Sequence, residues 1–153
     1  MRQILLAALA MSAMCSVGMT ADAPNFSGEW KMNPAKSNYG PFPAPASMVR
    51  KIELTEPSLV IVENQTGGAS DGTTTRKYTT DGKSSAFEIN GTAVVGSATW
   101  DGAALIVNTT VDSVGLSFKD RMSLSDDGKQ LTSVVQIATQ QGPAEVTIVF
   151  DRQ

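Results

Sequence analysis

The chain has 153 residues, a formal net charge of −3 and no histidine. The missing histidine excludes Ser-His-Asp and Cys-His catalysis, histidine metal clusters and a histidine-ligated haem. The mild acidity argues against sequence-independent binding of nucleic acid, which requires clustered lysine and arginine.

The first residues have the layout of a secretory signal peptide. Met1-Arg2 gives a positively charged start, an apolar run follows from 4 to 19, and small residues come at Ala21 and Ala23. We therefore expect residues 1–23 to be cleaved, so that the mature chain is periplasmic or secreted and keeps no membrane span. An uncleaved membrane anchor is the alternative.

Cys15 is the only cysteine and lies in this segment. A lipoprotein signal would have a leucine three residues before the cysteine and a small residue directly before it, but Ser12 and Met14 stand there. Lipid anchoring at Cys15 is therefore not expected, and the mature chain would have no disulfide, zinc-cysteine site or cysteine nucleophile.

The pattern in residues 24–153 predicts a single all-β domain. Val, Thr, Ile, Ser and Gly dominate, and Asp-Gly and Asn-Gly pairs, which suit tight hairpins, recur at short intervals. Strands at this spacing form an antiparallel meander. About ten strands are predicted, at 26–32, 47–56, 58–65, 73–79, 84–89, 93–100, 103–111, 116–124, 131–139 and 144–151.

An open meander of this length would expose two sheet edges, and closure into an up-and-down barrel removes them. A two-sheet β-sandwich is the alternative. No long connection of the Greek-key kind follows the proline-rich loop at 41–45, and this favours the barrel.

Period-two alternation assigns the faces of the strands. Phe26, Gly28, Trp30 and Met32 share one face of the first strand. Near the end of the chain, Asp120 shares a face with four apolar side chains, which are Leu116, Phe118, Met122 and Leu124. We expect a half-buried sheet with one apolar and one wet face.

The Gly28-Glu29-Trp30 run on the first strand, with Arg152 after the last strand, resembles the lipocalin and calycin superfamily. The resemblance implies that Trp30 closes one end of a barrel and that Arg152 packs across its indole. A Thr-Asp-Tyr-like run and a helix before the last strand, which accompany the motif in that superfamily, are missing. The segment WKMNPAKSNYGPFPAP, 30–45, is also similar to the start of small exported bacterial proteins, which implies no particular activity.

The candidate ligand site consists of four inward polar side chains, Arg50, Arg76, Tyr78 and Asp120. An apolar lumen with a few polar groups is how small-ligand sites are built, and an arginine there could hold a ligand carboxylate through two hydrogen bonds. Alternatively, an internal Arg–Asp pair only fixes strand register, or a bulge turns these residues outward.

No metal or cofactor site is expected. Asp126-Asp127-Gly128 lacks the further oxygen ligands of a calcium loop and reads as a turn. Glu53 and Glu56 share no cleft that would make them a glycosidase pair.

These observations predict an exported protein that binds a small, partly apolar molecule and catalyses nothing. One alternative is a structural or interaction module of the cell envelope with a side-chain-filled barrel. Another is a small barrel enzyme that uses Asp120 or a glutamate as acid or base. An open lumen would favour the first over the second, and a raised carboxylate pKa beside a cavity would favour the enzyme. The sequence leaves the ligand and the oligomeric state open.

Overall fold

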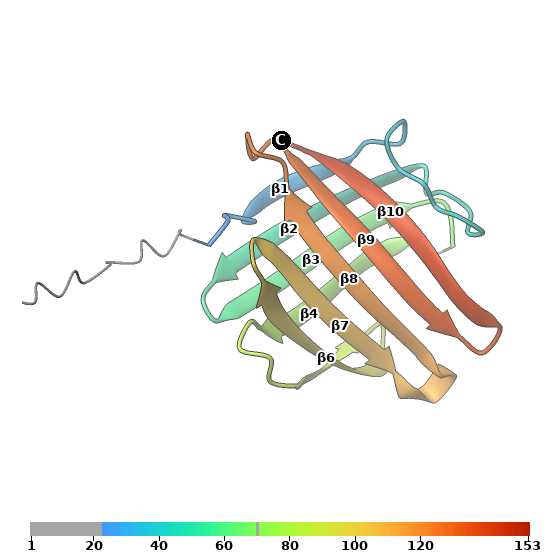
Figure 1. The fold of residues 1–153 in the computed structure, drawn as a ribbon. Helices are drawn as coiled ribbons and strands as arrows, with labels where there is room; N and C mark the ends of the chain where they lie inside the picture. The colour runs from blue at the N-terminus through green and yellow to red at the C-terminus, as the bar shows by residue number, and fades with distance from the viewer. Residues whose placement is uncertain (1–22, 70) are drawn as a thin grey trace, which may run out of the picture.

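Ten antiparallel strands form one continuous sheet in this computed structural model, which describes residues 23–69 and 71–153 (Figure 1). The elements are β1 (Gly28–Met32), β2 (Ser47–Thr55), β3 (Ser58–Thr66), β4 (Gly72–Thr79), β5 (Ser85–Ile89), β6 (Thr92–Asp101), β7 (Ala104–Val111), the 3-10 turn η1 (Asp112–Val114), β8 (Leu116–Leu124), β9 (Gln130–Thr139) and β10 (Gly142–Arg152). Cys15 and, apart from Ala23, the expected signal peptide lie outside the described residues.

The order of strands in the sheet is β4-β3-β2-β1-β10-β9-β8-β7-β6-β5. Neighbours in the sheet are therefore neighbours in the chain, except where β1 pairs with β10 and joins the two ends of the barrel domain. The predicted up-and-down barrel is confirmed, and the alternative β-sandwich is not formed.

The strand bounds agree with the expected ranges to within about two residues. Two differences concern β1 and its partner β10. β1 begins at Gly28, although Phe26 before it still faces the core. Arg152 is the last residue of β10 and does not follow the strand, because it pairs with Trp30 of β1.

The hairpin turns differ in backbone conformation. Asn90 and Gly91 both have positive φ, 50° and 78°, as the two-residue turn between β5 and β6 requires. In the Asp-Gly turns only the glycine has positive φ, at Gly82, Gly102 and Gly128. Asn-Gly therefore uses the positive φ that both central positions of a tight hairpin can take, whereas the Asp-Gly turns use it at the glycine alone.

Side chains close the barrel where β4 and β5, the two ends of the sheet, face each other without strand pairing. The Tyr78 ring of β4 packs edge-on against Phe87 of β5, with ring centroids 5.2 Å apart, and its hydroxyl hydrogen-bonds Thr109 at 2.8 Å. Gly96 of β6 leaves room for the ring, because a Cβ at this position would clash with it. This arrangement makes the barrel nearly closed.

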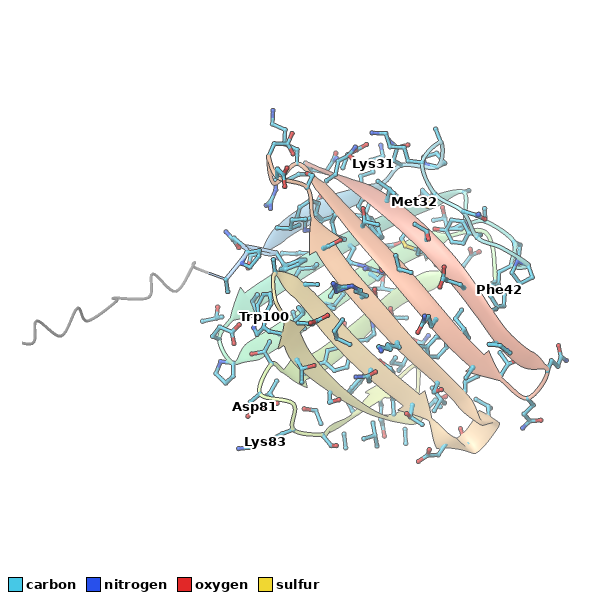
Figure 2. The ribbon with its side chains drawn as sticks, in the orientation of Figure 1. Lys31, Met32, Phe42, Asp81, Lys83 and Trp100 are labelled. Carbon is cyan, nitrogen blue, oxygen red and sulfur yellow. The ribbon has the colours of Figure 1, made fainter. Side chains whose placement is uncertain are left out.

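The loop between β1 and β2, residues 33–46, runs along β10 where β1 is too short to cover it. The Asn33 amide donates to the Val149 carbonyl at 2.7 Å, and Asn38 and Thr147 exchange two backbone hydrogen bonds of 2.7 and 2.8 Å. Farther on, the Ala46 amide donates to the Thr66 carbonyl at 2.7 Å. The loop is thereby held at one end of the barrel, where Figure 2 places Phe42, and Trp100 lies toward the opposite end.

Candidate functional site

The two ends of the barrel interior differ in packing. One end is filled by side chains with no solvent exposure, which include Phe26, Trp30, Leu59, Leu105, Leu131 and Phe150. We call this the closed end. The other end, where the loop 33–46 and the turns after β3, β5, β7 and β9 gather, holds a cavity. We call this the mouth end.

Arg152 and Trp30 stabilise the closed end. The Arg152 guanidinium lies 4.1 Å from the centre of the Trp30 ring, and the indole donates to the Phe26 carbonyl at 3.0 Å. Arg152 also donates to the carbonyls of Ser27, Asn25 and Gly128 at 2.8 to 3.0 Å. At Gly28, with φ of 140°, a Cβ would come within 2.8 Å of Arg152 Nη1, so the glycine makes room for the guanidinium.

The cavity has a volume of about 550 Å³. Most of its wall is apolar, and the polar side chains that reach it come from several strands. It is lined by Tyr39, Phe42, Pro43, Pro45, Met48, Arg50, Glu63, Gln65, Ala69, Thr74, Arg76, Ile89, Val107, Thr109, Val111, Leu116, Phe118, Asp120, Val135, Ile137, Thr139, Val146 and Ile148.

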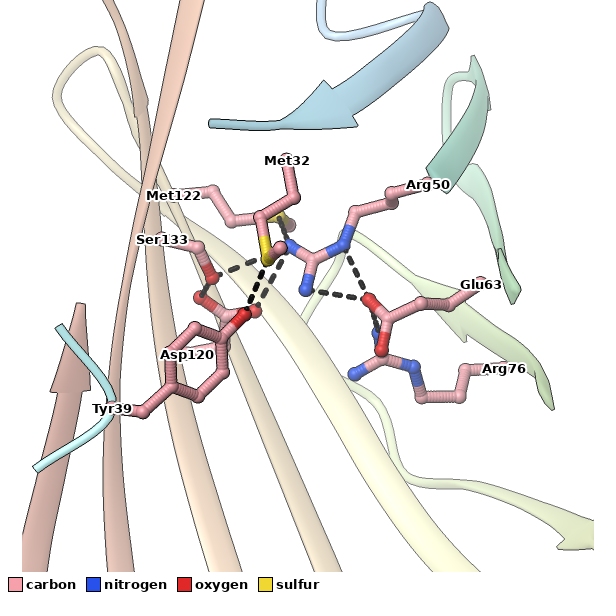
Figure 3. Close-up of polar contacts among 8 residues, drawn as sticks. All are labelled: Met32, Tyr39, Arg50, Glu63, Arg76, Asp120, Met122 and Ser133. Atoms are coloured by element: carbon pink, nitrogen blue, oxygen red, sulfur yellow. Dashed lines mark hydrogen bonds and ion pairs between the residues drawn. The ribbon is translucent and has the colours of Figure 1, made fainter. Parts of the chain in front are cut away.

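Two arginines and one glutamate form an ion-pair cluster in the cavity wall (Figure 3). Arg50 Nε and Nη2 each lie 2.7 Å from Glu63 Oε2, and Arg76 Nη2 lies 3.3 Å from the same oxygen. Burial alone would raise the pKa of the Glu63 carboxyl, but the charges of Arg50 and Arg76 outweigh it and hold the pKa below its usual value. Glu63 is therefore ionised at neutral pH.

Asp120 approaches the same cluster from the other side of the barrel. Its Oδ1 accepts a 2.5 Å hydrogen bond from the Ser133 hydroxyl, and its Oδ2 lies 3.5 Å from Arg50 Nη1. Arg50 Nη1 also donates to Ser133 Oγ at 3.2 Å, and the guanidinium lies 4.6 Å from the centre of the Phe150 ring. Arg50 and Asp120 are thus both buried, at 2% and 4% exposure, and face each other as members of one network.

Arg76 is held less completely than Arg50. Its Nε is buried and has no hydrogen-bond partner within residues 23–69 and 71–153. Burial would lower the pKa of Arg76, but the Glu63 carboxylate, followed by Tyr78 and Asp120, outweighs it and raises the pKa above its usual value. Arg76 is therefore a permanently charged group in the cavity wall.

Tyr78 lies beside the cavity and not in its lining. The ring fills the gap between β4 and β5, and the hydroxyl is bonded to Thr109. Burial raises the pKa of this phenol, and nearby Arg76 opposes the rise. Of the four expected ligand residues, the structure therefore brings Arg50, Arg76 and Asp120 to the cavity and gives Tyr78 a place in the barrel closure.

Glu63 is absent from the expected site, although two signals pointed to it. Leu59, Ile61 and Glu63 alternate on one face of β3, and the β2–β3 hairpin register places Glu63 opposite Arg50. Ser133 is a small polar residue in an apolar alternation and gave a weaker signal. Tyr39 gave none, because its position depends on how the loop 33–46 folds over the mouth end.

Tyr39 brings the loop 33–46 into contact with the cavity. Its hydroxyl donates to Met32 Sδ at 2.9 Å, and burial, followed by the nearby Glu63 charge, raises the pKa of Tyr39 to about 12. This phenol is therefore neutral at physiological pH. Phe42, Pro43 and Pro45 of the same loop also line the cavity.

No group of three or more Cys, Asp or Glu side chains in residues 23–69 and 71–153 is arranged to hold a metal ion. No helix within these ranges is long and apolar enough to cross a membrane.

No protein-family model matches the chain, and no curated protein matches its sequence. Solved structures do resemble it. Zebrafish ileal bile acid-binding protein complexed with cholic acid superposes with a TM-score of 0.61 at 17% identity, over 84% of this chain and 98% of that one. Fatty-acid-binding protein 1 of Echinococcus granulosus gives 0.60 at 12% identity, over 83% and 96%. A secretory abundant heat soluble protein of Ramazzottius varieornatus gives 0.62 at 11% identity, over 84% and 95%.

Identities this low establish the shared fold alone. Together with the strand order, these likenesses identify the fold as a calycin-type β-barrel of ten strands, as the resemblance carried by Gly28-Glu29-Trp30 implied.

Proposed function

We propose that the chain is an exported protein that binds a small, partly apolar molecule inside its barrel and catalyses no reaction. The cavity of about 550 Å³ at the mouth end carries this proposal. Small-molecule sites are typically concave, mostly apolar and roughly 300–1,000 Å³ in volume, with a few polar groups that orient the ligand. Arg50, Arg76 and Asp120 are the polar groups from the predicted set that reach this cavity.

Two of the similar structures support this reading by what they bind. One is a bile acid-binding protein complexed with cholic acid, and another is a fatty-acid-binding protein. Both share the barrel fold of this chain.

The two alternative functions receive less support. A side-chain-filled barrel would leave no space of this size at the mouth end. An enzyme that used Asp120 as acid or base would need that carboxyl free to exchange a proton with a substrate. Here Ser133 donates to one oxygen and Arg50 faces the other, so the carboxyl is already engaged.

Neighbouring positions on β9 provide a matched test of binding in the cavity. Val135 lines the cavity, whereas Val134 pairs with Arg121 and Thr147 and points to the outer face. We expect the neutral apolar dye Nile red to bind the parent protein and Val134→Trp alike, and to bind Val135→Trp much more weakly because the indole fills the lumen. Circular dichroism would verify that both variants fold.

Native mass spectrometry of protein purified from its own host would search for a retained small molecule. A dye that bound Val135→Trp as well as the parent would place the site elsewhere. Failure of the parent to bind dye, with no retained molecule, would favour the filled-barrel alternative.

Export has its own test. The proposal rests on the charged start, the apolar run of residues 4–19 and the small residues that follow. The intact mass of the exported protein should lack this segment, and a mass that still included it would contradict cleavage.

A further inference from the structure

We propose that the ligand carries a single acidic group, a carboxylate in its simplest form, and that Arg76 binds this group inside the barrel. The inference rests on the proposed function and names the head-group chemistry of the same cavity. It follows from how unequally the two inward-facing arginines are satisfied.

Arg50 has an acceptor for every guanidinium nitrogen. Nε and Nη2 bond Glu63, and Nη1 contacts Ser133 and Asp120. Its face also packs on Phe150. A ligand oxygen could reach Arg50 only by displacing one of these partners, so Arg50 orients the cluster and is not the free binding group.

Among the described residues, Arg76 has one ion-pair partner, Glu63, which it shares with Arg50. Its Nη2 contact to Glu63 is 3.3 Å, longer than the 2.7 Å contacts that Arg50 makes to the same oxygen, and its buried Nε has no partner among the described residues. Buried donors are almost always paired in folded proteins, and an unpaired one costs free energy. An acceptor supplied by a bound molecule would satisfy this arginine.

The carboxylates of the cluster offer less to a cationic ligand. Asp120 Oδ1 accepts from Ser133 and Oδ2 faces Arg50, while Glu63 is shared by two arginines. The group that lacks a full set of partners is therefore a donor, the Arg76 guanidinium, and not a carboxylate. A ligand anion complements it, whereas a ligand ammonium would lie beside a guanidinium.

The position of the cluster also sets the direction of the ligand. Arg50 packs on Phe150 and pairs in register with Trp30, so the cluster lies between the closed end and the cavity. Phe42 and Pro43 line the cavity from the loop at the mouth end. The acidic group would therefore point toward the closed end, and the apolar body would extend toward the loop 33–46.

Three probes with one alkyl chain and different head groups test this directly. Dodecanoate, dodecanol and dodecylammonium would be titrated calorimetrically into the parent protein, below the concentrations at which they aggregate. We expect dodecanoate to bind roughly ten- to a hundredfold more tightly than dodecanol, as a charge-assisted hydrogen bond allows, and dodecylammonium to bind most weakly. Equal binding of acid and alcohol, or tighter binding of the ammonium, would overturn the proposal without any variant.

Variants of neighbouring residues on β4 then assign the preference to a side chain. Arg76→Met keeps an apolar stem without the charge, and Lys77→Met is the matched control because Lys77 is exposed on the outer face. Arg76→Met should bind acid and alcohol equally, while Lys77→Met keeps the preference for the acid. A preference that survived Arg76→Met would overturn the assignment.

Nile red separates the acidic-ligand proposal from the cavity-binding proposal. If Nile red binds the parent and none of the alkyl probes does, the acidic-ligand proposal fails alone. If Nile red also fails to bind, the cavity-binding proposal fails with it.

Discussion

At the scale of single residues, Glu63 determines whether two arginines can remain inside the barrel. Each buried guanidinium loses its hydration, and the loss is recovered only through close contact with an opposite charge and good hydrogen bonds. Glu63 provides this contact to Arg50 at 2.7 Å and to Arg76 at 3.3 Å. Removal of its charge would leave two cations with only the more distant Asp120 as compensation.

Glu63→Gln should therefore destabilise the protein strongly and in a pH-dependent way. Near pH 7 we expect a loss of roughly 3–5 kcal/mol in the free energy of unfolding, as for other broken buried pairs. The folded-state pKa of Glu63 is lowered, so its contribution is present above the unfolded pKa of about 4.3 and is lost as pH falls through the folded value. Urea melts at neutral and acid pH should show that the difference in the free energy of unfolding between parent and variant becomes smaller in acid.

The control for this experiment is Glu53→Gln on the same hairpin. Within the described part of the chain Glu53 pairs with Lys51 alone, and both side chains are more than half exposed. The change should alter stability by no more than about 0.5 kcal/mol. If the free energies of unfolding of parent and Glu63→Gln differed by the same amount at all pH values, the charge on Glu63 would not be stabilising.

Trp30 and Arg152 allow a second prediction at this scale. Trp30→Ala should cost roughly 3–5 kcal/mol, because the indole has no solvent exposure and its loss leaves a cavity at the closed end. Arg152→Ala should cost less, and in a Trp100→Phe background it should shift the emission of Trp30 by removing the cation 4.1 Å above the ring. Denaturant melts and fluorescence spectra would measure both; a Trp30→Ala protein as stable as the parent would show that the indole does not close the barrel.

At the scale of elements, β4 and β5 are held together by side chains where every other neighbouring pair in the barrel is held by a ladder. Tyr78 occupies the space that two paired backbones would otherwise fill, and it can do so only because position 96 on β6 is a glycine. Packing of the Tyr78 ring on Gly96 thus takes the place of backbone hydrogen bonds between β4 and β5.

Gly96→Ala tests this fit. The added methyl group would overlap the Tyr78 ring, and overpacking of this kind costs roughly 1–3 kcal/mol. In a Tyr78→Ala background the same change should cost less, since the ring is gone and only the close approach of the methyl group to the Asn108 carbonyl oxygen, at 2.9 Å, remains. Ser97→Ala, at the next position of β6, is the control and should change stability by no more than about 0.5 kcal/mol. Equal costs of Gly96→Ala in both backgrounds, measured by thermal or urea melts, would mean that Tyr78 does not pack on Gly96.

The elements themselves could be predicted from the sequence because alternation and turn residues are local signals. Those signals place Asp120 among apolar side chains, and the structure has it 4% exposed. What local signals cannot provide is the partner across the sheet. Alternation puts Glu63 on the inner face of β3, but only the β2–β3 register sets it opposite Arg50, and the role of Gly96 requires knowing that Tyr78 lies over it. The cavity depends on side chains from nearly every strand, so its volume could not be predicted.

At the scale of the whole molecule, one end of the barrel interior is packed with side chains and the other end holds a cavity. Large apolar side chains fill the closed end, and the ion-pair cluster separates them from the cavity at the mouth end. Packing at one end can hold the sheet together while the other end keeps room for a ligand. Truncation of an apolar side chain to alanine should therefore lower stability mainly at the closed end and alter ligand binding mainly at the mouth end.

β9 carries one leucine and one isoleucine that test this division on a single strand. Leu131 is fully buried at the closed end, opposite Leu124 and Phe150, whereas Ile137 is half-buried and lines the cavity. Leu131→Ala should cost roughly 2–5 kcal/mol in the free energy of unfolding. Ile137→Ala should cost less than about 2 kcal/mol, because the side chain faces existing space and loses fewer contacts. The affinity for Nile red should change in Ile137→Ala and stay constant in Leu131→Ala, under conditions where both variants are folded. Equal losses of stability, together with unchanged dye binding in both variants, would mean that the mouth end is packed like the closed end and that the barrel holds no ligand there.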